Sequence, residues 1–273
     1  MPVEGRIEAL HIAMIGHGPI ASYVVRQLAD RPDVTVAWVV CRAGREDAAK
    51  TAFGPKVHPV VRVDDIGEAV DLAIDCAGHD GLRSHGAAFL RRGVDLITVS
   101  NGALADAELA EILEASAFAG GAQLELLSGA VGAIDALAAA KIGGLARVSY
   151  VARKPPAGWK GTPAELLLDL GRLTKPGCHF EGSAREAALR YPKNANVAAT
   201  IALAGTGLDE TQVRLIADPA IDANCHEIEA EGAFGKFSFK IEGNPLPDNP
   251  KSSALTAMSV VRSVLNRLEP VIP

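Results

Sequence analysis

The chain has 273 residues, of which 48% are hydrophobic and 22% charged, so its composition is that of a folded protein with one large or two modest domains. Acidic residues outnumber basic ones, 33 against 27, and the net charge of −6 gives no electrostatic reason to expect nucleic acid or an anionic membrane as a partner. The four cysteines are far apart, without a CxxC pair or a Cys/His pair at ligand spacing, so neither a disulfide framework nor a metal site is predicted.

The first half of the chain alternates strand and helix patterns. Short apolar runs predict strands at residues 11–15, 34–41, 71–76, 95–100 and 123–127. Helix patterns lie between them at 82–92 and 107–118, and an earlier one has Ile20, Val24 and Leu28 at four-residue steps. Strands that alternate with helices are typical of βαβ units, whose right-handed crossovers give a doubly wound parallel sheet.

A glycine turn joins the first predicted strand to the first helix. Gly16, Gly18 and Ala21 match the GxGxxG/A pattern in its strand–turn–helix context. Gly16 permits a tight turn, and Gly18 lets the backbone approach a pyrophosphate. Pro19 and Ile20 then begin the helix, whose free N–H groups face the phosphates. The pattern predicts a Rossmann domain that binds a dinucleotide; a merely tight structural turn is the alternative.

The end of the second predicted strand bears on the choice of cofactor. A strict NAD enzyme has an acid there that binds the adenosine ribose. This chain has Arg42 instead, and its next acids are Glu46 and Asp47. Because arginine pairs with a ribose 2′-phosphate, NADP is expected alongside NAD. The alternative is that Arg42 is a solvated loop residue.

Two small residues follow a later strand of the same predicted sheet. Ala77 and Gly78 come directly after the run at 71–76. The carboxyl ends of parallel strands share one edge of the sheet, where ligands bind. We therefore expect Ala77 and Gly78 to contact the cofactor and to leave room for its nicotinamide half.

After Gly129 the pattern changes to a mixture of helices and strands. Helices are predicted at 134–142, 163–173, 183–191 and 196–203, and strands at 147–153, 213–217, 225–231 and 234–242. Ser183 and Glu186 have the spacing of a helix capping box. A last helix carries an apolar stripe that is expected to face the core, formed by Met258, Val261, Leu265 and Leu268.

These patterns predict an α/β protein of two domains. Residues 1–127 form a dinucleotide-binding Rossmann domain with a doubly wound parallel sheet, and the C-terminal helix within 252–273 packs back on it. Residues 128–251 form a second, α+β domain, since its strands and helices do not alternate regularly.

Two strings in the second half, YPKNANVAATIALAG and FEGSAREAA, are far more specific than a glycine pattern. Together with the glycine turn, Ser-Gly-Ala at 128–130 and Asn-Cys-His at 224–226, they make the chain resemble the L-aspartate dehydrogenase family from Ile12 to the last helix. The resemblance implies a homodimer in which an α+β catalytic and dimerisation domain follows a Rossmann domain. It also implies that NAD or NADP is the cofactor.

The resemblance carries site residues with it. The family's catalytic histidine follows an Asn-x-His pattern, which here identifies His226, and its further cofactor contacts match Ala130 and Asn196. A histidine that titrates near neutral pH can take and return protons while an amine is oxidised to an imine that water attacks. A buried structural histidine is the alternative for His226.

A substrate with two carboxylates needs cationic and amide donors. The expected substrate residues are Ser128, Lys154, Lys193 and Asn194, with Arg153 and Lys160 as further cations. Any single lysine among them could instead be a solvated surface charge.

The sequence therefore predicts a member of the L-aspartate dehydrogenase family. Such an enzyme converts L-aspartate, NAD(P)⁺ and water to oxaloacetate, ammonium and NAD(P)H through iminoaspartate, which would feed NAD biosynthesis. The alternatives are another two-domain reductase, of dihydrodipicolinate or homoserine type, and a non-catalytic nucleotide-sensing module. No apolar stretch approaches the roughly 18 residues of a membrane span, and the N-terminal residues lack a signal-peptide layout, so a cytoplasmic location is expected.

Overall fold

The computed structural model describes residues 9–192, 194, 196–247 and 249–272. The chain forms two compact units. The first comprises the residues up to Ser100, Ala107–Leu127 and Ala257–Pro273, and the second comprises Asn101–Asp106 and Ser128–Thr256. The division places a short segment, Asn101–Asp106, in the second unit although it lies between two elements of the first.

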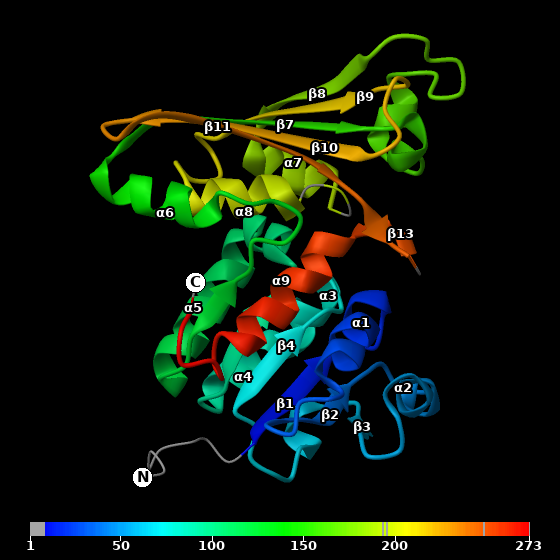
Figure 1. Cartoon of the computed structure of the whole chain (residues 1–273), viewed down its shortest axis with the longest axis vertical. Coiled ribbons are helices and arrows are strands. Elements are labelled where there is room, and N and C mark those ends of the chain that lie inside the picture. The colour runs from blue at the N-terminus through cyan, green and yellow to red at the C-terminus, as the bar shows by residue number, and fades with distance from the viewer. Residues whose placement is uncertain (1–8, 193, 195, 248, 273) are drawn as a thin grey trace. The chain divides into compact units, whose positions relative to one another are not determined.

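The first unit is built on a six-stranded parallel sheet (Figure 1). Its strands are β1 (Leu10–Ile15), β2 (Val34–Val40), β3 (His58–Val60), β4 (Leu72–Asp75), β5 (Asp95–Thr98) and β6 (Leu124–Leu126). Their order is β3-β2-β1-β4-β5-β6, which is that of a dinucleotide-binding Rossmann sheet. The predicted doubly wound parallel sheet is confirmed. The sequence analysis missed β3, a three-residue edge strand that contains a proline.

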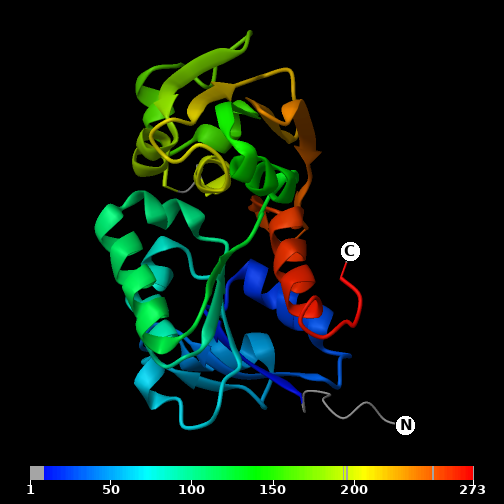
Figure 2. The same cartoon turned by 90° about the vertical axis from the view of Figure 1, so that its left-hand side faces the viewer.

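Helices cover both faces of this sheet. They are α1 (Pro19–Leu28), α2 (Glu46–Phe53), α3 (His79–Gly81), α4 (Ala87–Arg91), α5 (Ala107–Gly120) and α9 (Ala254–Leu265). Figures 1 and 2 show α1 and α9 on one face and α4 and α5 on the other. The predicted helix at 82–92 begins earlier, at His79, and its Leu82–Gly86 segment is a π-helix.

The last helix buries the predicted stripe only in part: Val261, Leu265 and Leu268 pack, partly buried, against the core of the first unit, and Met258 does not. Ala257, Val260 and Val264 are fully buried, and the last two join the apolar core of the first unit. Met258 is 46% exposed, so its assignment to the core-facing stripe is wrong. The buried face is centred on the small and β-branched side chains, and the longer Leu265 and Leu268 pack at its margin.

The second unit contains a mixed five-stranded sheet. Its strands are β7 (Leu145–Lys154), β8 (Gly177–Ser183), β9 (Gln212–Ala217), β10 (Asn224–Gly232) and β11 (Gly235–Gly243), in the order β11-β10-β7-β9-β8. Only the β7–β9 pair is parallel among these strands of the described chain. A separate ribbon pairs β12 (Pro245–Leu246) with β13 (Asn249–Ser253).

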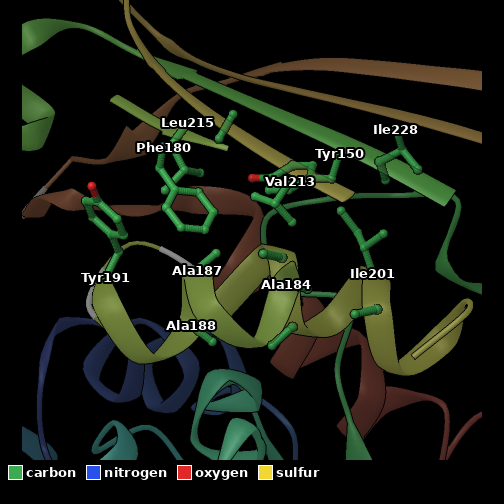
Figure 3. Packing of buried hydrophobic residues seen from close by; sticks show 14 of the residues in the cluster. Tyr150, Phe180, Ala184, Ala187, Ala188, Tyr191, Ile201, Val213, Leu215 and Ile228 are labelled. Atoms are coloured by element: carbon green, nitrogen blue, oxygen red, sulfur yellow. The ribbon is translucent and has the colours of Figure 1, made fainter. Parts of the chain in front are cut away.

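One face of the mixed sheet packs on three helices, α6 (Ile134–Gly143), α7 (Ala184–Arg190) and α8 (Asn196–Ala204) (Figure 1). Figure 3 shows the resulting core, with the rings of Tyr150 and Phe180 lying between the sheet and the helices. Alanines on α7, among them Ala184 and Ala187, are fully buried and let the helix approach the sheet closely. The capping box of Ser183 and Glu186 is present at the start of α7, as predicted.

The segment between β7 and β8 departs from the sequence prediction. The helix expected at 163–173 is wrong: a 3-10 helix covers only Pro163–Leu166, and turns follow. Leu166 is 87% exposed and Leu167 65%, so the apolar side chains that suggested a helix have no core to pack against. Within the described ranges, no helix is long and apolar enough to cross a membrane.

Candidate active site

The glycine turn of the first unit has the geometry that a dinucleotide needs. Gly16 directly follows β1 with φ +88°, and an added Cβ would stand 2.8 Å from the Cβ of Ala77, so only glycine fits. Gly18 differs, because a Cβ there meets no heavy atom within 4 Å. Protein packing therefore does not demand glycine at position 18, and the backbone there is open to the close approach of a ligand.

Helix α1 begins directly after this turn. Gly18 is its N-cap in extended conformation, no side chain caps the helix, and the first turn, which starts with Pro19 and Ile20, holds no acid. The first N–H groups of the helix are thus free of a side-chain cap and carry the positive end of its dipole. This arrangement fits the pyrophosphate of a pyridine dinucleotide.

The end of β4 is fixed by a buried carboxylate that the sequence analysis did not single out. Asp75 is fully buried and accepts hydrogen bonds from the Ala77 N–H at 3.0 Å and from Thr98 Oγ1 at 2.7 Å. Burial raises the pKa of Asp75. Gly78 follows with φ +82°. Asp75 therefore shapes the turn that carries Ala77 and Gly78; an acid at the end of an otherwise apolar strand was the available signal.

Arg42 lies two residues beyond the end of β2 and is exposed. The pKa of His17, in the glycine turn, is lowered first by burial and then by the charges of Arg45 and Arg42. Both arginines therefore act electrostatically on the glycine turn. The structure thus brings a positive potential to the turn, on the side where the second strand ends.

His226 lies in the second unit, on β10, and only 3% of it is exposed. Its neighbour across the ladder in β7 is Ala152. Tyr150 and Lys154 stand two residues to either side of Ala152, so all three side chains of β7 lie on the same face as His226. The Tyr150 hydroxyl is 2.7 Å from His226 Nδ1.

Lys154 is a buried cation, and no carboxylate of the described residues pairs with it. It is 9% exposed, its Nζ donates to Asn194 Oδ1 at 2.8 Å, and it lies 5.0 Å from the centre of the Trp159 ring. Within the described part of the chain it takes part in no salt bridge. Burial lowers the pKa of Lys154 to about 8. A buried ammonium of this kind is electrostatically suited to bind an anion.

The two groups act on one another. Burial first, and then the charge of Lys154, lower the pKa of His226 to about 3, so the imidazole is neutral near pH 7. A neutral imidazole beside an uncompensated ammonium can bind a carboxylate and exchange a hydrogen with the group next to it. The sequence prediction named His226, Lys154 and Asn194, and the structure brings these three together; it did not name Tyr150 or Trp159 as site residues.

The other predicted residues of this unit are placed as follows. Asn196 begins α8, and its Oδ1 accepts from the Gly102 N–H at 3.0 Å. Ser128 is half-buried and Ala130 is buried in the loop before α6, and no described hydrogen bond joins either to His226. Lys193 lies outside the described residues. The described chain has no group of three His, Cys, Asp or Glu side chains that could hold a metal ion.

Comparison with known proteins matches the two parts of the chain to two different family models. The family model described as aspartate dehydrogenase, C-terminal, matches residues 135–267, and the one described as homoserine dehydrogenase, NAD binding domain, matches residues 16–126. An L-aspartate dehydrogenase of Ruegeria pomeroyi is 55% identical over 260 residues, 95% of this chain and 93% of that protein. One of Pseudomonas aeruginosa is 49% identical, over 94% of this chain and 97% of that protein.

Solved structures give the same picture. The crystal structure of aspartate dehydrogenase from Thermotoga maritima aligns with a TM-score of 0.76 at 27% identity, covering 97% of this chain and 99% of that one. A hyperthermophilic archaeal homoserine dehydrogenase in complex with NADPH aligns with a TM-score of 0.58 at 12% identity, which shows a shared fold alone.

Proposed function

The chain belongs to the aspartate dehydrogenase family, and on that premise we propose that it catalyses the NAD(P)-dependent oxidative deamination of L-aspartate. L-Aspartate and NAD(P)⁺ give iminoaspartate, NAD(P)H and a proton, and water then converts iminoaspartate to oxaloacetate and ammonium. The observation that carries the assignment is the buried Lys154 beside His226, a cation without an acidic partner among the described residues. The reaction is reversible.

The residues of the chain divide the work between them. When bound, the nicotinamide accepts a hydride from the amine-bearing carbon of the substrate. Gly16, Gly18 and the start of α1 hold the pyrophosphate. Lys154 binds a substrate carboxylate with Asn194 at its side, and burial strengthens this attraction because little water competes. His226, through Nε2, serves as acid/base toward the reacting amine and water.

The remaining predicted residues keep supporting roles in this proposal. Ala77, Gly78, Ala130 and Asn196 contact the cofactor, and Ser128 and Lys193 contact the substrate. Their support is the resemblance of their sequence motifs to those of the family.

Initial rates with a panel of amino acids test the substrate. We expect turnover with L-aspartate and none with homoserine, because only aspartate supplies a second carboxylate for the buried cation. Reduction of the cofactor by homoserine would favour a homoserine-type reductase, and binding of the cofactor without turnover of any amino acid would favour a nucleotide sensor. The match of residues 135–267 to the aspartate dehydrogenase description speaks against both alternatives.

We expect NADP to be used at least as well as NAD. The loop after β2 offers Arg42 and no acid before Glu46, at the start of α2. Replacing Arg42 with alanine should raise the KM for NADP by about 10-fold and leave the KM for NAD nearly unchanged. A charged hydrogen bond contributes about 1.5–3 kcal/mol, and the lower end applies because Arg42 is exposed. Steady-state kinetics with both cofactors measure this.

NAD is the internal control for that experiment, since it lacks only the 2′-phosphate. Equal changes in both KM values would mean that Arg42 does not read the 2′-phosphate. Failure of the unaltered enzyme to use NADP would contradict the interpretation of this strand end altogether.

We further propose that the enzyme is a homodimer formed through the second unit. Figure 1 shows α6, α7 and α8 on one side of the mixed sheet of this unit. The dimer itself is supported by the family resemblance and by the prevalence of twofold symmetry among oligomers. Light scattering at micromolar concentrations should give a mass twice the 28.4 kDa of one chain. A mass of one chain across that range would refute the dimer.

The cellular role follows from the immediate product. We propose that the enzyme acts in the cytoplasm and that iminoaspartate leaves it for pyridine-nucleotide biosynthesis. A reaction coupled to an enzyme that consumes iminoaspartate should trap this product before water hydrolyses it. Recovery of oxaloacetate alone in the coupled reaction would contradict that role.

A further inference from the structure

We propose that Tyr150 is a positioning residue for His226, whose hydroxyl holds the neutral ring in the tautomer that carries its hydrogen on Nε2. The inference rests on the proposed function insofar as it assigns His226 to the reaction. It adds that Nε2 of His226, the nitrogen proposed to act on the substrate, carries a hydrogen in the resting enzyme, and that Tyr150 determines this.

The geometry of two neighbouring strands creates the contact. His226 on β10 pairs with Ala152 of β7, and Tyr150 lies two residues before Ala152 on the same face. The small Ala152 leaves the space across which the two rings meet, with centroids 6.0 Å apart and an interplanar angle of 13°. The hydroxyl is 2.7 Å from Nδ1, and both residues are buried, with 1% of Tyr150 and 3% of His226 exposed.

Only one hydrogen can lie between the hydroxyl oxygen and Nδ1. Tyr150 keeps its proton, because burial raises the pKa of its hydroxyl. If the ring donated from Nδ1, the hydroxyl hydrogen would need another acceptor, and within the described chain Tyr150 has no hydrogen-bond partner besides His226. An unpaired buried hydroxyl hydrogen is unfavourable. The hydroxyl therefore donates to Nδ1, and the hydrogen of the neutral ring is on Nε2.

The other groups around His226 do not select the tautomer. Lys154 flanks it on β7 and its charge favours the neutral ring, but its described hydrogen bond goes to Asn194 and not to either ring nitrogen. The partner on β11 is the apolar Ile241. Cys225 and Glu227, the neighbours of His226 on its own strand, point to the opposite face of the sheet. Tyr150 is thus the group that distinguishes Nδ1 from Nε2.

This arrangement defines the first action of the ring. With Nδ1 occupied, Nε2 presents a hydrogen to an oxygen or nitrogen on which negative charge develops, as a neutral imidazole donor. For Nε2 to accept a proton instead, the ring must carry its one hydrogen on Nδ1: the Nε2 hydrogen passes to substrate or water, Nδ1 takes up a proton, and the Tyr150 hydroxyl turns to accept from Nδ1–H. The resting ring is therefore a donor at Nε2, and the hydroxyl of Tyr150 controls its change to the acceptor that takes a proton from the amine.

Nitrogen NMR of enzyme labelled with ¹⁵N-histidine tests this without turnover. The His226 signals, assigned by their absence in His226→Ala, should show hydrogen on Nε2 in the unaltered protein. In Tyr150→Phe, which keeps the ring, the fraction with hydrogen on Nε2 should fall and the pKa of His226 should rise, because a hydrogen bond to the neutral form is lost. We expect kcat to fall about 10-fold while the KM for L-aspartate stays within about twofold.

Tyr191→Phe is the matched control. The Tyr191 hydroxyl makes the same kind of contact, 3.1 Å from His179 Nδ1, in the same core. It should leave the tautomer of His226 and kcat nearly unchanged. The proposal is overturned if the unaltered protein carries hydrogen on Nδ1 of His226, or if Tyr150→Phe leaves both tautomer and kcat as they were.

The tautomer is measured on the unaltered protein, so the test holds even if Tyr150→Phe does not fold. It also separates two failures. An enzyme that does not oxidise L-aspartate refutes the proposed function, whereas hydrogen on Nδ1 refutes the positioning role.

Discussion

Replacing His226 with alanine should lower kcat for L-aspartate at least about 100-fold, the lower range for a positioned acid or base. The side chain is buried, is neutral near pH 7 because its pKa is lowered to about 3, and lies on the same face as Lys154. His226 is not among the residues proposed to contact the cofactor, so the dissociation constant for the cofactor should change little. Steady-state kinetics and a cofactor titration by fluorescence measure the two effects.

His179 provides the matched control for this substitution. It is also buried in the second unit, contacts a tyrosine hydroxyl through Nδ1, and has a pKa lowered to about 4 by burial first and then by the charge of Lys154. His179→Asn should retain kcat within about 10-fold of the unaltered enzyme, since the ring contacts Trp159 and Tyr191 and is assigned no role in the reaction. A folded His226→Ala enzyme with nearly unaltered turnover would rule out the acid/base role of His226.

The Rossmann unit could be predicted closely from the sequence because its signals are local. The glycine turn, the apolar β1 and the helix that follows lie within about 20 consecutive residues, and each is recognised by spacing alone. The second unit was predicted less well. Strand β8 carries polar residues and therefore lacks a clear strand pattern. The exposed Leu166 and Leu167 gave a false helix pattern. The secondary structure of both segments is thus determined by packing and not by local sequence.

The candidate site shows the same limit. His226 was predicted from a family motif, Lys154 from its charge, and Asn194 as an amide donor for the substrate carboxylates. The role of Tyr150 depends on the register of β7 against β10, which pairs residues about 75 positions apart. Strand register is set by the whole sheet and its core, so no local feature of the sequence contains it. Alternation on one strand, Tyr150–Ala152–Lys154, becomes informative only when the partner strand is known.

The second large effect is expected at Lys154. Succinate, a dicarboxylate without an amine, should inhibit competitively with L-aspartate, and Lys154→Met should raise its inhibition constant about 30-fold or more. Removal of one partner from a buried charge pair costs about 2–5 kcal/mol. Since about 1.4 kcal/mol corresponds to a tenfold change in a binding constant, the lower end of that range is a roughly 30-fold effect. Methionine keeps an apolar stem of similar length over Trp159, so the core is preserved. Lys160→Met, which removes an exposed lysine from the same segment, should change the constant little.

The pH dependence of succinate inhibition is a second, independent test of carboxylate binding by Lys154. The ammonium form of Lys154 binds the carboxylate, and in the free enzyme that form predominates below its pKa of about 8. The inhibition constant should therefore be flat below pH 8 and rise up to tenfold per pH unit above it, because succinate itself does not titrate there. In Lys154→Met the inhibition constant should be large and independent of pH throughout this range. A constant that stays flat above pH 8 in the unaltered enzyme, or unaltered inhibition in Lys154→Met, would mean that another group binds the carboxylate.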